Sequence, residues 1–439
     1  MTPSNIRDRL VDPALTVRQD RTLIRANGRS ERFLLVDVVA PTVAPDPSRR
    51  RPPVNLGFVL DRSGSMGGQN KLGLAKQAVL EAIHRLEAED RFSVVTYDDE
   101  IDVVAGNVTA SAAERGRAAD RLRRIEARNS TNLHGGWLTG CEQVATGLDA
   151  TGVNRVLLLT DGLANVGITD PDELQRLAGE LRARGITTST FGVGTDFDER
   201  LLQGMADAGG GHFYFIGDVA QMRDHITSEV GETLEVVARD VVLEIRLPDS
   251  VRVEPLSPFR AEQRDGIARV FRGDMVSGQV ISLVLRVTFD YGEIGREVGV
   301  SVRLGDRDGA FDVAVPAPQP VTLGWRYADT TDNDSQPRDR DVDRVVARLF
   351  AERAKQEAVR LNRDGRYDEA ERAIEGVRRR VSAYAGSDPE LRALVAELRE
   401  ERPQYAAAMP EMVRKQVHFA SSASLRSRMP DGKSQRRNQ

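Results

Sequence analysis

Between residues 54 and 229, short apolar runs alternate with segments whose apolar residues recur at helical spacing. The segment 71–87 carries apolar side chains at positions 72, 75, 79, 83 and 86, which predicts an amphipathic helix. Strands that alternate with helices are typical of a layered α/β fold with a mostly parallel sheet. The pattern therefore predicts a doubly wound α/β domain over residues 50–235. Its predicted strands are VNLGFVL, RFSVVTY, RVLLLT, ITTSTFGVG and HFYFI.

The segments on either side of this block change to a period of two residues. Apolar residues alternate with mostly polar neighbours over 241–247 and again over 281–289, as in half-buried antiparallel strands. The N-terminal stretch LTVRQDRTLIRANGRSERFLLVDVVAP resembles two more strands, which are too few to form a core alone. We therefore predict one β-sandwich from residues 10–45 and 236–327, with the α/β domain inserted at a surface loop. A separate N-terminal extension that packs on the α/β domain is the alternative.

The rest of the chain is predicted to be mostly helical. Residues 328–341 are polar, acidic and proline-containing, which predicts an exposed linker. Three amphipathic segments follow and predict a small helical bundle over 342–419, docked on the sandwich. Beyond residue 413 the chain is rich in Lys and Arg with several serines, so we predict a disordered basic tail over 420–439.

Composition and charge exclude several classes of protein. The 439 residues include one cysteine, Cys141, which excludes an intramolecular disulfide framework and a zinc cage of several thiolates. The 62 basic and 67 acidic residues are interspersed, so nothing draws the whole chain to nucleic acid. No apolar run approaches the ~20 residues that span a bilayer, and the N-terminus lacks the pattern of a secretion signal. We predict a cytoplasmic protein without a membrane span.

Candidate chemistry lies where the predicted parallel strands end. Asp61, Ser63 and Ser65 follow the first strand in a glycine-relieved loop, Asp161 follows the most apolar strand, and Thr131 precedes a helix. Ligands of open α/β sheets collect at the carboxyl ends of the strands. Hard oxygen ligands of this kind suit Mg²⁺. Taken alone, however, the motif DxSxS is more simply a turn or a helix cap, because Asp and Ser are common in both.

The order of these motifs along the chain resembles the von Willebrand factor A domain family over ~180 residues. In that family the matching positions form the metal-ion-dependent adhesion site, so the resemblance implies that a divalent cation, Mg²⁺ or Mn²⁺, binds here. TYDDEIDVV, FGVGTDFDERLL and GGGHFYFI are further family-like stretches. The flanking sandwich and helices resemble bacterial proteins that carry this domain, though no motif there is as specific. The five residues that match the family's metal site are Asp61, Ser63, Ser65, Thr131 and Asp161.

The resemblance implies binding without turnover. The family uses its metal to accept an Asp or Glu carboxylate from a partner protein, which here predicts an adaptor or scaffold. Such domains serve AAA+ ATPases or kinase and phosphatase signalling modules, and no motif in this chain chooses among them. Two alternatives stay open: a metal-dependent hydrolase or phosphotransferase, and a structural protein with an unused site. A serine nucleophile would need a general base, and His134 is the one histidine placed near the predicted metal.

Overall fold

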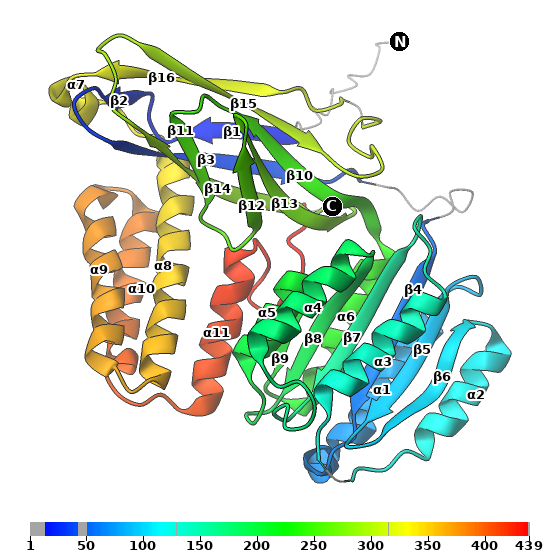
Figure 1. The fold of residues 1–439 in the computed structure, drawn as a ribbon. Coiled ribbons are helices and arrows are strands. Elements are labelled where there is room, and N and C mark those ends of the chain that lie inside the picture. Colours follow the sequence, from blue (N-terminus) through cyan, green and yellow to red (C-terminus); the bar gives the residue numbers. More distant parts are fainter. Residues whose placement is uncertain (1–13, 43–50, 129, 315, 438–439) are drawn as a thin grey trace, which may run out of the picture.

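The computed structural model describes residues 14–42, 51–128, 130–314 and 316–437 (Figure 1). An α/β layer domain, a two-sheet β structure and a group of C-terminal helices pack against one another. The predicted fold class is confirmed. The predicted domain limits stay predictions, and residues 10–13 and 43–45 of them lie outside the described residues. None of the described helices is long and apolar enough to cross a membrane.

The α/β domain has one six-stranded sheet with helices on both faces (Figure 1). Its strands are β4 (Val54–Asp61), β5 (Arg91–Tyr97), β6 (Ile101–Thr109), β7 (Val153–Thr160), β8 (Ile186–Val193) and β9 (Gly210–Ile216). Their order is β6-β5-β4-β7-β8-β9, and every neighbouring pair is parallel except β5 with β6. Its helices are η1 (Gly64–Asn70), α1 (Lys71–His84), α2 (Ala112–Arg123), α3 (Leu133–Thr146), α4 (Pro171–Ala183), α5 (Glu199–Gly209), η2 (Val219–Gln221) and α6 (Met222–Leu234).

Strands β4 and β7 are buried along their whole length, which explains why their sequences are continuous apolar runs. Helix α3 lies close against β4 because a glycine faces the strand. A Cβ atom at Gly140 would lie only 2.2 Å from Cγ2 of Val59. This close packing fixes the start of α3 relative to the carboxyl end of β4, where the candidate metal ligands lie.

Two mostly antiparallel sheets form the sandwich. Their strands are β1 (Leu15–Gln19), β2 (Leu23–Arg25), β3 (Ser30–Val39), β10 (Val236–Arg246), β11 (Val251–Pro255), β12 (Arg260–Arg264), β13 (Ile267–Val276), β14 (Val280–Phe289), β15 (Glu297–Gly305) and β16 (Val321–Ala328). One sheet has the order β1-β3-β14-β11 and the other β12-β13-β10-β15-β16-β2, with β2 parallel to β16. Strand β3 pairs with β14 from Ser30 opposite Phe289 to Val39 opposite Val280. The N-terminal strands thus complete sheets whose other strands follow the α/β domain.

The segment predicted as an exposed linker is exposed at most of its positions, but residues 330–336 are folded against the sandwich, so the prediction of a linker is wrong there. It contains α7 (Thr330–Ser335) and is tied to β2 and its approach. Gln336 accepts hydrogen bonds from the backbone N–H of Thr22 at 3.1 Å and of Leu23 at 2.7 Å. Arg25 donates to Asp334 at 2.7 Å. Its polar side chains therefore bond to the edge strand of a sheet, which composition does not reveal.

Four helices follow: α8 (Arg340–Arg363), α9 (Tyr367–Ala385), α10 (Pro389–Tyr405) and α11 (Glu411–Leu425). The prediction of a disordered tail over 420–439 is wrong for residues 420–437, which are described. Phe419 of α11 lies 5.9 Å, ring to ring, from Phe213 of β9, within the core of the α/β domain. Arg428 is buried and donates to Glu232 at 2.7 Å. Arg426, Arg428 and Arg436 of this tail each pair with an acidic group of the α/β domain.

A truncated chain that begins at residue 50 tests how far the sandwich depends on β1, β2 and β3. The truncation removes β3, which exposes the edge of β14 and the apolar face that β3 covers. We therefore expect the truncated protein to aggregate. An isolated fragment of residues 50–235 should stay soluble, because it keeps most of its own core. Size-exclusion chromatography with light scattering measures both. A monomeric truncated chain with an unchanged unfolding midpoint would refute the dependence.

Candidate metal centre

Strand β4 ends at Asp61, and its buried carboxylate organises the loop that follows. One carboxylate oxygen accepts a hydrogen bond from the backbone N–H of Ser63 at 2.7 Å. The other accepts from the Thr160 hydroxyl, at the end of the neighbouring strand β7, at 2.6 Å. Asp61 therefore holds the loop and the two strand ends together.

The serines of the loop connect Asp61 to Asp161. The Ser63 and Ser65 hydroxyl oxygens lie 3.2 Å apart. The Ser65 hydroxyl donates to Oδ1 of Asp161 at 2.6 Å. Four of the predicted ligands thus form one chain of oxygens across the carboxyl ends of β4 and β7.

Thr131 enters the same region from the start of α3. Its N–H donates to the Asn165 side chain at 3.1 Å. A Cβ atom at Gly162 would lie 3.5 Å from the Thr131 hydroxyl oxygen and 4.0 Å from that of Ser65. The structure therefore places all five predicted residues around one point at the sheet edge.

Three further residues, which are not among the five predicted ligands, shape this site. Thr160 positions Asp61, as described. The backbone carbonyl of Asp98 accepts from Asn132 N–H at 2.7 Å and fixes the segment next to Thr131. Lys71 reaches Asp161, with its Nζ 2.6 Å from Oδ2. The position of Thr160 directly before Asp161 is a sequence signal that it lies at the site. Nothing in the sequence indicates that the side chain of Lys71, at the start of α1, reaches Asp161.

The electrostatics of the site favour an added cation. Asp61 and Asp161 have no solvent exposure, and Lys71 is the one described ammonium or guanidinium in an ion pair with either. Burial raises the pKa of Asp61 to about 6, and the nearby Asp161 adds to the effect. Two buried carboxylates beside one ammonium leave an excess negative charge, and the remaining groups are neutral hydroxyls. This donor set fits a hard divalent cation such as Mg²⁺.

His134 does not act on the serines in this arrangement. Its Nε2 is buried without a hydrogen-bond partner, and burial lowers the pKa of its imidazole. Its Nδ1 faces the loop at Gly167, where a Cβ atom would lie 3.4 Å away. Among the described residues no histidine hydrogen-bonds to Ser63 or Ser65. Neither serine has, among these residues, the histidine partner of a common serine nucleophile, and the group that accepts the Ser65 proton is the Asp161 carboxylate.

The family described as von Willebrand factor type A domain matches residues 55–228. The uncharacterized protein YfbK of Escherichia coli (strain K12) is 31% identical over 251 residues, which is 55% of this chain and 43% of that protein. The chain thus spans less than half of that relative. An uncharacterized protein of Synechocystis sp. is 28% identical over 328 residues, 71% of this chain and 76% of that protein.

The fold as a whole also has a solved counterpart. A protein described as von Willebrand factor type A from Catenulispora acidiphila superposes with a TM-score of 0.68. The match covers 93% of this chain and 90% of that chain at 19% sequence identity. The similarity therefore extends beyond the α/β domain to the sandwich and the C-terminal helices, as a similarity of fold.

The loop between β8 and α5, with the first residue of α5, lies between the candidate metal site and the C-terminal helices. On one side a Cβ atom at Gly194 would lie 3.7 Å from Nζ of Lys71. On the other side Glu199 is buried against α11, with its carboxylate 2.7 Å from Nζ of Lys415 and 2.9 Å from Arg414. Lys415 also donates to the Phe197 carbonyl at 2.6 Å. Burial opposes ionisation of Glu199, but Lys415 and Arg414 outweigh it and lower the pKa of Glu199 to about 2.

Replacing Lys415 with Met should weaken the contact between α11 and the α/β domain. The change removes a charged hydrogen bond from buried Glu199, so we expect a loss of about 1.5–3 kcal/mol in the free energy of unfolding. Because the folded-state pKa of Glu199 is depressed, its contribution is present above about pH 4.5 and is lost as the pH falls toward about 2. Urea unfolding at several pH values measures both.

Lys433→Met is the matched control, since Lys433 is half exposed and pairs with the exposed Asp431. It should change stability by less than about 1 kcal/mol. Equal effects of the two substitutions would contradict a specific role for the buried pair.

Proposed function

Because residues 55–228 belong to the von Willebrand factor type A domain family, we propose that this protein is a metal-dependent adaptor that binds a partner protein. In this proposal Asp61, Ser63, Ser65, Thr131 and Asp161 hold Mg²⁺ or Mn²⁺, directly or through water. The observation that carries the proposal is the convergence of these oxygens at one sheet edge, with two buried carboxylates among them. A bound cation would supply a positively charged open position for a carboxylate of the partner.

Each residue has a distinct part in this proposal. Asp61 and Asp161 provide negative charge, and the hydroxyls of Ser63, Ser65 and Thr131 provide neutral oxygens. The two carboxylates only just balance the charge of a divalent cation. A charged oxygen from the partner therefore competes well against water for the cation's open coordination position. Thr160 holds Asp61 in place through its 2.6 Å hydrogen bond. Lys71 neutralises Asp161 until a cation replaces it.

Binding is favoured over catalysis by the surroundings of the serines. Neither serine has a histidine partner among the described residues, and the Ser65 hydroxyl already donates to Asp161. A hydrolase or phosphotransferase would need a base at this point, and the one described carboxylate that accepts from Ser65 is Asp161, which this proposal assigns to the cation. A structural role without metal would leave two buried carboxylates with a single neutralising lysine, which costs free energy.

The remaining parts of the chain are proposed to position the binding domain. Helix α11 is joined to the loop after β8 through Phe197 and to the start of α5 through Glu199, so a change at the candidate metal site can reach the C-terminal helices. AAA+ ATPases and kinase or phosphatase signalling modules stay predicted partner classes, and a partner with an accessible Asp or Glu is the chemical requirement.

Isothermal titration calorimetry with Mg²⁺ tests the metal site. Wild-type protein should bind one ion, and Asp61→Ala should abolish binding while the circular dichroism spectrum stays unchanged. Affinity should fall as the pH drops below about 6, because protons then compete for Asp61. Unchanged affinity in Asp61→Ala would exclude this assignment.

Replacing Lys71 should strengthen Mg²⁺ binding, whereas replacing Asp61 should abolish it. Removal of the lysine frees Asp161 from a charged hydrogen bond that the cation must otherwise displace, so Lys71→Met should bind Mg²⁺ at least about tenfold more tightly. Lys76→Met is the control on the same helix, because Nζ of Lys76 donates to the Ile125 carbonyl at 2.8 Å. Calorimetry that shows weaker binding in Lys71→Met would mean that the lysine supports the site.

Partner binding should require the ion and a carboxylate together. Affinity capture in Mg²⁺ with wild-type and Asp61→Ala protein identifies the metal-dependent partner. With that partner, a carboxylate-to-amide substitution, Thr131→Ala or EDTA should each weaken binding by roughly 30-fold, which corresponds to about 2 kcal/mol. Thr146→Ala, at the exposed far end of α3, is the matched control. Full affinity in EDTA would show that the partner uses another surface.

A further inference from the structure

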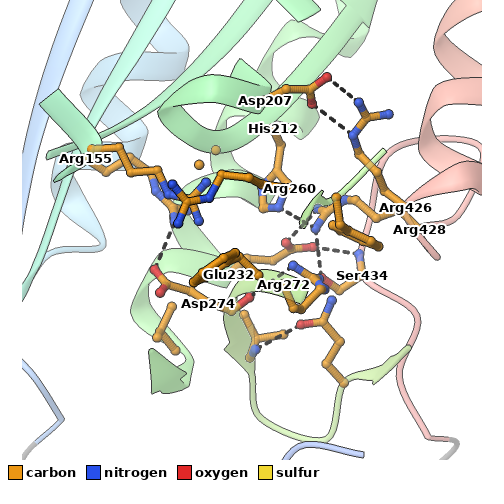
Figure 2. A pocket seen from close by; sticks show the side chains of 18 of the residues that line it. Arg155, Asp207, His212, Glu232, Arg260, Arg272, Asp274, Arg426, Arg428 and Ser434 are labelled. Atoms are coloured by element: carbon orange, nitrogen blue, oxygen red, sulfur yellow. Dashed lines mark hydrogen bonds and ion pairs between the residues drawn. The ribbon is translucent and has the colours of Figure 1, made fainter. Parts of the chain in front are cut away.

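A small pocket lies where the α/β domain, the sandwich and the C-terminal segment meet (Figure 2). Its volume is about 70 Å³. A water molecule needs about 10–15 Å³ of such volume, so the pocket has room for several waters or one small polyatomic ion. The α/β domain contributes Arg182 and His212, the sandwich contributes Arg260 and Arg272, and the C-terminal segment contributes Arg428. This pocket lies away from the metal edge, since β9 begins beside it.

Some of the arginines at the pocket are neutralised by carboxylates. Arg428 pairs with Glu232 at 2.7 Å. Arg155 pairs with Glu229 at 2.9 Å, and its other terminal nitrogen lies 3.6 Å from Asp274. Arg426 donates to Asp207 at 2.9 Å. These arginines bring no uncompensated charge to the pocket.

Three other arginines at the pocket form no ion pair with a described carboxylate, although Asp274 and Glu232 act on Arg272 from a greater distance. No described carboxylate lies within 4.0 Å of the guanidinium nitrogens of Arg182, Arg260 or Arg272. Arg260 lies over the ring of Phe271, 4.0 Å from its centroid, at the exposed mouth. Arg272 is only 9% exposed. The pocket therefore concentrates positive charge, part of it buried.

Two buried donors at the pocket also lack acceptors among the described residues. Nε of Arg272 has no hydrogen-bond partner, and its Nη1 makes only a long contact of 3.4 Å to the Asp274 carbonyl. Nε2 of Gln279 has none either. The Gln279 amide is oriented by its oxygen, which accepts from Val276 N–H at 3.0 Å, so the free atom is a donor. Water could satisfy these donors, but it would not compensate the charge.

A metal ion fits this place poorly. His212, Glu229 and Glu232 bring possible ligand atoms within 4.8 Å of one another. Their carboxylates, however, already accept from Arg155 and Arg428, and Glu229 also accepts from Tyr214 at 2.7 Å. A cation would have to displace guanidinium groups from buried acids, and the nearby unpaired arginines would repel it.

We propose that this pocket binds a small tetrahedral oxyanion of the phosphate class, with Arg272 as the buried anchor. The guanidinium fork of Arg272 donates to two oxygens, and Nε2 of Gln279 donates to a third. Arg260 closes the exposed side, and Arg182 adds charge from the α/β domain. Because the walls come from three parts of the chain, the bound anion holds the α/β domain, the sandwich and the C-terminal segment in one arrangement. The proposal is independent of the metal site.

Calorimetric and thermal titrations of the full chain with sodium phosphate test the site, with ionic strength held constant by chloride. Wild-type protein should show saturable binding and a higher unfolding temperature in phosphate. Arg272→Met should reduce phosphate affinity at least tenfold. It should also unfold at a higher temperature than wild type in phosphate-free buffer, because it removes a buried charge that forms no ion pair with a described carboxylate. Arg264→Met removes an equal charge at an exposed position of the same sheet and should leave affinity unchanged.

A second variant tests the site independently, in case Arg272→Met does not fold. Gln279→Glu keeps the oxygen that accepts from Val276 but replaces the donor with a negative oxygen, so phosphate binding should again fall at least tenfold.

Glycerol phosphate distinguishes free phosphate from the phosphate group of a larger ligand. Tighter Arg272-dependent binding of glycerol phosphate assigns the larger ligand, and tighter binding of phosphate assigns the free ion. Equal stabilisation of wild type and both variants by phosphate, or no effect of millimolar phosphate on wild type, would overturn the proposal.

Discussion

The pairing of β3 with β14 is the constraint on which the rest of the architecture depends. These strands run antiparallel from Ser30 opposite Phe289 to Val39 opposite Val280, so the chain must return to its own beginning after completing the α/β domain. The domain is thereby attached at the amino end of β4, and its carboxyl strand ends point away from the sandwich (Figure 1). The candidate metal site lies at this far edge, where the sandwich does not cover it.

Buried charges, together with apolar contacts, hold the parts in place. Glu199 with Lys415 and Glu232 with Arg428 join the C-terminal segment to the α/β domain at opposite ends of the sheet. Such pairs add little net stability compared with apolar packing, but removing one member is costly because the other charge stays buried. They specify one docked arrangement of α11, while Phe419 supplies apolar area. The same logic explains why the candidate metal site holds Lys71.

The parts of this fold that follow local periodicity could be predicted from the sequence. The apolar runs of β4 and β7 and the alternation along β10 and β14 carry their own signatures, and the oxygens at Asp61 and Asp161 follow from strand ends. Contacts between distant segments left no such signal. Lys71 has the same helical surroundings as any exposed lysine, and its contact with Asp161 depends on three-dimensional packing. The tail near Arg428 has the composition of a disordered segment, since its partners are more than 190 residues away.

The separation of β3 from β14 also determines the order in which the protein can assemble on the ribosome. Val280 is synthesised 241 residues after Val39, the difference of the two numbers. At about 5–20 residues per second, β3 waits roughly 12–50 s for its partner while the α/β domain is completed. During that interval the apolar strands at the N-terminus have no sheet to join. Nascent chains are therefore most vulnerable to misassembly before β14 emerges, and the inserted domain is the first part able to fold.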